Sequence, residues 1–152
     1  MAGLKLFVNS GEVAFVAATA KTALQIKAPT NQRLLLKQVR IMGKQPAGGT
    51  DTPVKVRLTR STANFGTGTA DTPGKLNPSN GETVQSTAAS NFTVEPTSPT
   101  DSGLWWEVQP QTGVIEFEPI TDPIEIPGGQ SIQCEITSVA TPTLLVTFEY
   151  EE

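Results

Sequence analysis

Residues 33–44 read RLLLKQVRIMGK and form the longest strand candidate in the chain. Side chains alternate between the two faces of a strand. Leu34 and Leu36 therefore point to one face, whereas Val39 and Ile41 point to the other. The apolar face therefore changes side at residues 37–38. A β-bulge there would add one residue and place all four apolar side chains on one side. The alternative is a strand whose two faces are both partly covered.

Shorter segments along the chain repeat this alternation of apolar and polar residues. They predict further strands at residues 22–28, 54–60, 104–109, 114–118, 124–126, 131–138 and 144–150. Residues 104–109 and 114–118 are predicted to pair as a hairpin across a four-residue loop. With 13 glycines and 12 prolines, few segments are long enough for a helix. About eight short strands therefore predict an all-β chain, folded as a single antiparallel β-sandwich.

The predicted core of this sandwich consists of the inward-facing residues of the strands. They are Leu36, Val39, Ile41, Val56, Leu58, Trp106, Ile115, Ile132, Ile136, Val146 and Phe148.

The first 20 residues contain two short apolar pieces, and nothing caps or terminates this region as a helix would be capped. We therefore predict an extended N-terminal arm at residues 1–20, followed by the sandwich domain at residues 21–152. The arm carries an apolar group made of Leu4, Leu6, Phe7 and Val8. The alternative is an ordinary edge strand that folds onto its own domain.

Composition excludes several classes of protein. No run approaches the ~20 apolar residues that a membrane helix needs, and residues 1–20 lack the basic start and compact apolar centre of a signal peptide. Cys134 is the single cysteine, which excludes an internal disulfide and is compatible with synthesis in a reducing cytoplasm. We therefore expect neither a membrane span nor a secreted, disulfide-bonded domain.

Charge is divided unevenly along the chain. All 11 basic residues lie at or before Lys75, together with three acidic ones, whereas residues 76–152 hold 12 acidic residues and no basic one. The two parts thus carry net charges of +8 and −12. One interpretation is that strands from the two parts interleave within one sandwich, and another is that an acidic rim meets a basic rim between subunits of an oligomer; the two can both hold.

Catalytic chemistry has few candidates. The chain has no histidine, which excludes histidine-based acid–base catalysis and most zinc sites. Cys134 has the parity of a core residue. Glu116 and Glu118 share one strand face, with Cβ atoms roughly 7 Å apart, a separation that suits a glycosidase pair. Exposed glutamates that alternate with apolar residues are also ordinary patterning, so we predict a protein that is not an enzyme.

Ligand motifs are equally scarce. No glycine-rich loop matches a nucleotide fingerprint, and the Asp-Thr and Asp-Ser pairs of the loops are sufficiently explained as turn formers. We therefore predict no cofactor and no metal. The net charge of −4 and the lack of interleaved aromatic residues argue against nucleic acid as a partner.

The adjacent tryptophans point to opposite faces of their strand. Trp106 has core parity, whereas Trp105 shares its face with Glu107 and Gln109. An exposed tryptophan is typical of an interface anchor or a sugar platform; the alternative is that the loop at residues 96–102 covers it. The predicted interface between subunits consists of Trp105, Lys55, Arg57, Glu116 and Glu118.

Four turn-and-strand motifs suggest a family. They are APTNQR at residues 28–33, PVKVRL at 53–58, WEVQP at 106–110 with Gly113, and PGGQSI at 127–132. In this order, over roughly residues 22–150, the chain resembles jelly-roll-like decoration, or cement, proteins encoded among the head genes of tailed bacteriophages. The resemblance implies a jelly-roll-like sandwich that trimerises on the outer capsid surface and reinforces the shell.

The function expected from this resemblance is structural. The protein would be made in the host cytoplasm, bind the major capsid protein on the outside of the virion as a homotrimer, and stabilise the expanded head, with Leu4, Leu6, Phe7 and Val8 docking on the shell. The alternative is a glycan-binding β-sandwich module of a tail or fibre, with an aromatic-lined groove around Glu116 and Glu118. A secreted lectin is disfavoured by the absence of a signal peptide and of disulfides.

Overall fold

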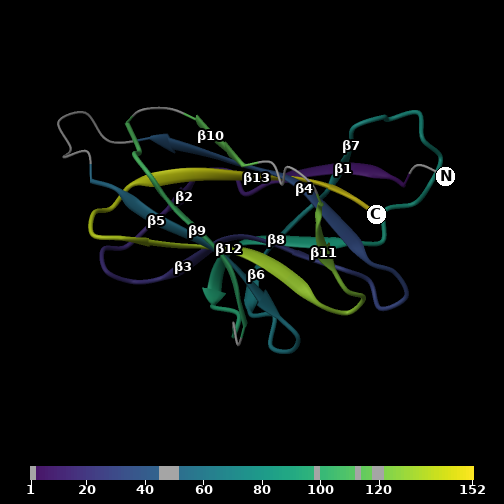
Figure 1. The fold of residues 1–152 in the computed structure, drawn as a ribbon, viewed down its shortest axis with the longest axis horizontal. Coiled ribbons are helices and arrows are strands. Elements are labelled where there is room, and N and C mark those ends of the chain that lie inside the picture. Colours follow the sequence, from purple (N-terminus) through teal and green to yellow (C-terminus); the bar gives the residue numbers. More distant parts are fainter. Residues whose placement is uncertain (1–2, 45–51, 98–99, 112–113, 118–121) are drawn as a thin grey trace.

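The computed structural model describes residues 3–44, 52–97, 100–111, 114–117 and 122–152, with the backbone alone at residue 44, 100–103 and 114–116. These residues form two antiparallel β-sheets that face one another across a single apolar core (Figure 1). The described part of the chain contains no helix, and thus none long and apolar enough to cross a membrane. The predicted β-sandwich is confirmed, whereas its assignment as a jelly roll stays a prediction.

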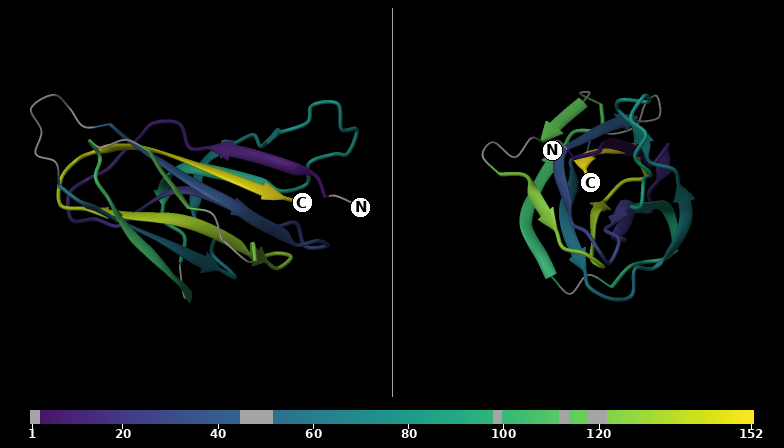
Figure 2. Two further views of the ribbon diagram at one scale, coloured as in Figure 1. Left: turned by 45° about the horizontal axis from the view of Figure 1, so that its top comes forward. Right: turned by 90° about the vertical axis from the view of Figure 1, so that its right-hand side faces the viewer.

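The two sheets, here called A and B, run along the long axis of the molecule (Figure 2, left). Sheet A has the order β10-β4-β13-β1-β7, with β11 beside β4 and β2 beside β13. Its strands are β1 (Lys5–Asn9), β2 (Val13–Ala14), β4 (Leu34–Lys44), β7 (Gly74–Lys75), β10 (Val114–Phe117), β11 (Ile124–Ile126) and β13 (Thr143–Glu151). Sheet B has the order β6-β8-β3-β12-β5-β9. Its strands are β3 (Lys21–Lys27), β5 (Val54–Ser61), β6 (Thr67–Asp71), β8 (Thr87–Val94), β9 (Thr100–Val108) and β12 (Ser131–Ser138).

Strand β4 contains the predicted bulge. Gln38 pairs with Glu149 and Leu36 with Tyr150, so Lys37 is an extra residue on β4. The four aliphatic side chains on either side of it, at positions 34, 36, 39 and 41, are all buried. The bulge thus aligns both halves of the strand with the core, as the change of parity predicted.

The predicted core is confirmed for nearly all of its residues. Eight aliphatic members and Phe148 are fully buried. Trp106 is only partly buried and packs against the core, stacked on Phe117 with ring centroids 5.2 Å apart. The side chain of Ile115 lies outside the described residues.

The predicted hairpin of residues 104–109 and 114–118 is wrong. Strand β9 pairs with β5 in sheet B, whereas β10 pairs with β4 in sheet A. A four-residue loop suits a hairpin, but it also suits a link from the edge of one sheet to the edge of the other. Trp106 of β9 stacks on Phe117 of β10, and this contact between the two edge strands favours the link from sheet to sheet.

The expected N-terminal arm is corrected by the structure. Strand β1 lies between β13 and β7 in sheet A, and Leu4, Leu6 and Val8 are buried at 3%, 0% and 2% exposure. These side chains are therefore not available for docking on a partner. Phe7 points to the outer face of the sheet and is 37% exposed.

The two oppositely charged parts of the chain interleave. In sheet B, strands from before and after residue 76 alternate without exception across the six positions. Ion pairs accordingly join the two parts, from Lys37 to Glu151 and from Arg57 to Glu135. The charges thus compensate within a single copy of the chain.

Candidate functional site

The predicted interface residues that the structure describes meet on the outer face of sheet B. Lys55 and Arg57 project from β5, and Trp105 projects from the neighbouring β9. Glu107 on β9 and Glu135 on β12 lie directly opposite Lys55 and Arg57 in the strand register. We call these five residues the Trp105 surface.

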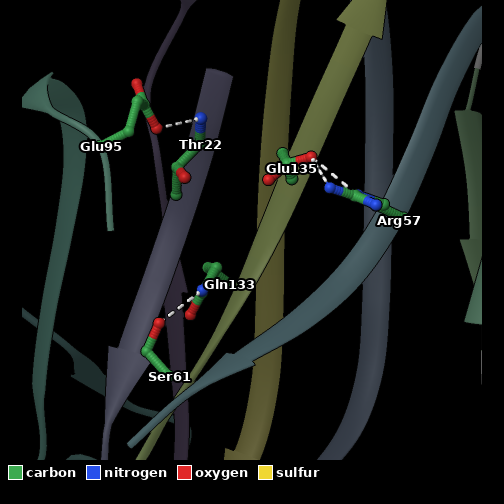
Figure 3. A network of polar contacts seen from close by, with 6 residues as sticks. All are labelled: Thr22, Arg57, Ser61, Glu95, Gln133 and Glu135. Carbon is green, nitrogen blue, oxygen red and sulfur yellow. Dashed lines mark hydrogen bonds and ion pairs between the residues drawn. The ribbon is translucent and has the colours of Figure 1, made fainter. Parts of the chain in front are cut away.

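Trp105 is the apolar centre of this surface. Its side chain is 59% exposed, so the predicted exposure of Trp105 is confirmed. Lys55 Nζ lies 5.1 Å from the centre of its ring, within the range of a cation–π contact. Arg57 holds Glu135 through two contacts, from Nη2 at 2.6 Å and from Nε at 2.7 Å (Figure 3). An exposed tryptophan among ordered charged residues has the composition of an interface anchor with a polar rim.

The Trp105 surface ends where the chain covers its own sheet. Between β8 and β9, residues 95–97 pass over the outer face: Glu95 accepts a hydrogen bond of 2.8 Å from the backbone N–H of Thr22, and the Thr97 carbonyl accepts one of 2.5 Å from Ser61 Oγ. Beneath them Gln133, although outward by parity, is fully buried and donates to Ser61 Oγ at 3.0 Å (Figure 3). These buried polar groups fix the covering segment in place, because an unpaired buried amide is costly.

The remaining predicted site residues are not brought to this surface. Glu118 and the side chain of Glu116 lie outside the described residues, so the carboxylate pair stays a prediction. Leu4, Leu6 and Val8 are in the core, as described above.

Other reactive groups are isolated. Cys134 is completely buried, and burial raises the pKa of its thiol far above the usual range, so a nucleophilic thiolate does not form. The described residues contain no group of three or more histidine, cysteine or acidic side chains that could hold a metal ion. Asp71 Oδ2 and Trp106 Nε1 are buried without a hydrogen-bond partner, but they lie on opposite edge strands of sheet B.

A second polar cluster ties the chain termini together. Glu152 accepts hydrogen bonds from the backbone N–H groups of Gln85 (2.8 Å) and Ser86 (3.1 Å) and from Ser86 Oγ (2.7 Å). Glu151 Oε1 accepts one of 2.9 Å from the backbone N–H of Gly3. Ser86 Oγ also lies 2.9 Å from the hydroxyl of Tyr150. We call these six residues the terminal clasp.

Sequence reasoning found part of these clusters. Strand parity predicted that Trp105, Lys55 and Arg57 face outward, but not that their strands are neighbours. Sequence reasoning missed Glu135 as a member of this surface. Its outward parity within residues 131–138 was predicted, but the pairing of that strand with the strand of Arg57 was not. The terminal clasp left no signal at all, because its donors come from sequence positions far from the two glutamates.

Comparison with known proteins adds no relative. No known protein-family model and no curated protein matches the chain.

Proposed function

We propose that this protein is a virion structural protein that binds the outside of a phage head and stabilises the expanded shell. The observation that carries the proposal is the Trp105 surface, an ordered interface anchor on a sandwich whose reactive groups are buried or isolated. The ordered series of turn motifs by which the chain resembles capsid decoration proteins supports it as well. A domain of this kind acts by binding, and it is not an enzyme.

Self-association as a homotrimer is part of the proposal. The uneven charge along the chain no longer motivates it, because the charges compensate within one copy. Its support is Trp105, which at 59% exposure presents a large apolar ring to solvent. Light scattering should give a trimer mass that falls to that of the monomer in Trp105→Ala. A monomer at micromolar concentration for both proteins contradicts the trimer.

The stabilising role follows from mass action. A protein that binds only the expanded shell shifts the shell's stability, and many symmetric copies add their effects. The test is to mix the full chain with bare expanded heads and measure co-sedimentation and the resistance of the heads to heat and chelator. Heads that neither bind the protein nor gain resistance contradict the proposal. Binding to a glycan array that is lost in Trp105→Ala would instead favour the tail-associated glycan-binding module.

A further inference from the structure

Three asparagines in the described part of the chain form the same local turn. In each turn, the side-chain oxygen Oδ1 accepts a hydrogen bond from the backbone N–H two residues later: Asn9 from Gly11 (3.2 Å), Asn77 from Ser79 (3.1 Å) and Asn80 from Glu82 (2.8 Å). The ring closed by this bond contains both the side-chain carbonyl carbon and the nitrogen of the next residue. Such a turn therefore folds an electrophilic carbon back toward a backbone nitrogen, and the state of that nitrogen decides whether the two react.

The nitrogen that follows the asparagine differs among the three turns. Ser10 is buried at 7% exposure, and its N–H donates to the Val146 carbonyl at 2.9 Å. Pro78 has no N–H. Gly81 is exposed, a Cβ at its position would meet nothing within 4 Å, and no acceptor among the described residues takes its N–H. Of the three pairs, Asn80-Gly81 is thus the one whose nitrogen is accessible and carries a proton that it can lose.

Lys75 acts on the same peptide bond. The loop that joins β7 to β8 lies near the chain termini (Figure 1), and within it Lys75 Nζ donates to the backbone carbonyl of Asn80 at 2.8 Å. This carbonyl belongs to the peptide bond of the Gly81 nitrogen, and a cation on its oxygen makes the N–H more acidic. The N–H of Glu82 stabilises the negative charge that develops on Oδ1 when Cγ of Asn80 is attacked. Both the nucleophile and the electrophile are therefore activated.

We propose that Asn80 is a site of spontaneous deamidation, with water as the only co-reactant. The Gly81 nitrogen loses its proton and bonds to Cγ of Asn80, which closes a five-membered succinimide ring. The bond from Cγ to Nδ2 breaks, and Nδ2 leaves with the electron pair and takes up a proton, so that ammonia is released. No atom is oxidised or reduced in this step. The inference does not rest on the proposed function.

Lys75 also selects the product of the hydrolysis that follows. Water that adds to the former side-chain carbon of the succinimide gives aspartate, whereas water that adds to the former main-chain carbon gives an isoaspartyl bond. Lys75 polarises the former main-chain carbonyl, and the carboxylate that forms from it stays beside the ammonium group. The main product is therefore the isoaspartyl form, which adds one negative charge and one main-chain atom to the loop.

The test ages the full chain at neutral pH and follows each asparagine by peptide mass spectrometry, while an isoaspartyl methyltransferase counts isoaspartyl bonds. Asn80 should lose its amide and give more isoaspartate than aspartate, whereas Asn9 and Asn77 should keep theirs. Gly81→Ala should slow the loss by about tenfold or more, because a methyl group hinders the approach of the nitrogen. Alanine fits at this position, since a Cβ there meets nothing within 4 Å.

A pair of lysine variants tests the activation. Lys75→Met should slow the loss at Asn80 by about fivefold and lower the share of isoaspartate. Lys21→Met is the matched control, because Lys21 Nζ also donates to a backbone carbonyl, that of Ala14 at 3.5 Å. It should leave both the rate and the products at Asn80 unchanged.

Three outcomes would overturn the proposal or its parts. If Asn80 keeps its amide for longer than a free peptide of residues 76–85 does, the fold protects the pair and the site is wrong. If Asn9 reacts as fast as Asn80, the nitrogen after the turn does not select the site. If Lys75→Met reacts like Lys21→Met, or faster, the contact with the Asn80 carbonyl does not activate the peptide bond, and the role of Lys75 is wrong.

Discussion

The two ends of the sandwich differ in what their side chains do, although strand β13 runs from one end to the other. At one end apolar side chains are exposed, whereas at the other end carboxylates are hydrogen-bonded. At the end opposite the termini, here called the tip, β13 begins in a stretch without charged residues, beside the exposed side chains of Val16 and Val139. Backbone hydrogen bonds from Phe15 and Ala18 to residues 142 and 138 join the two segments that carry these valines. At the termini, β13 ends in Glu151 and Glu152, whose carboxylates accept hydrogen bonds above the buried ring of Tyr150. Figure 2 (right) looks onto this second end, where the two termini lie close together.

The side chains that stabilise the fold and the apolar side chains that are exposed to solvent thus lie at different ends of the molecule. Side chains at the terminal end contribute to folding because they are buried or hydrogen-bonded in the native state. Side chains at the tip contribute little to folding, because Val16 and Val139 stay in water in the native state. Mutations at the two ends should therefore affect different measurements.

The largest contrast is expected between two aliphatic residues that the sequence placed in one segment. Leu6→Ala should lower the free energy of unfolding by about 2–5 kcal/mol, because Leu6 is fully buried at the terminal end. Val16→Ala should change it by less than about 0.5 kcal/mol, because Val16 faces solvent. Urea unfolding followed by tryptophan fluorescence measures both. Equal small effects would restore the extended arm that the fold excludes.

That segment also shows how far sequence reasoning reaches. Parity predicted the bulge in β4, the core and the exposure of Trp105, because each depends on alternation within one strand. It did not place residues 5–9, because alternation is the same in a free strand and in one paired with a partner near residue 150. The hairpin error and the terminal clasp share this cause, since each depends on which distant segments lie side by side.

The next effect in size concerns the clasp itself. Glu152→Ala removes the acceptor of three hydrogen bonds from Gln85 and Ser86 and should lower the free energy of unfolding by about 1–3 kcal/mol. Glu125→Ala is the control, because Glu125 pairs with Arg33 at an exposed site and should cost at most about 1 kcal/mol. Equal losses in the two variants would mean that the clasp is an ordinary surface contact.

A smaller effect is expected from the buried hydroxyl under the clasp. Tyr150→Phe keeps the packed ring and removes the contact with Ser86 Oγ, which should cost about 0.5–1.5 kcal/mol. A double-mutant cycle with Ser86→Ala isolates the pair, and the double variant should lose less than the sum of the single losses. Additive losses would show that the two hydroxyls do not interact.

The smallest effect, and the one most specific to the terminal end, is a dependence on pH. The backbone N–H of Gly3, and to a lesser extent Lys37, lower the pKa of Glu151 below its ordinary value of 4.5. The carboxyl group of Glu151 therefore binds a proton less tightly in the folded state than in the unfolded chain. The stabilisation by the Glu151 carboxylate is fully present at pH values above the pKa of Glu151 in the unfolded chain. It is lost as the pH falls below about 4.5 and through the lower pKa of Glu151 in the folded state.

Glu151→Gln tests this linkage, because the amide does not titrate. At pH 7 the variant should be less stable than the wild type, and the gap between their free energies of unfolding should close as the pH falls toward 3. Glu125→Gln corrects for the general loss of one negative charge. Val139 at the tip carries no titratable group, so Val139→Thr should follow the wild-type pH curve throughout. A gap for Glu151→Gln that stays constant from pH 7 to pH 3 would mean that the carboxylate does not fasten Gly3, and that the terminal end is held by packing alone.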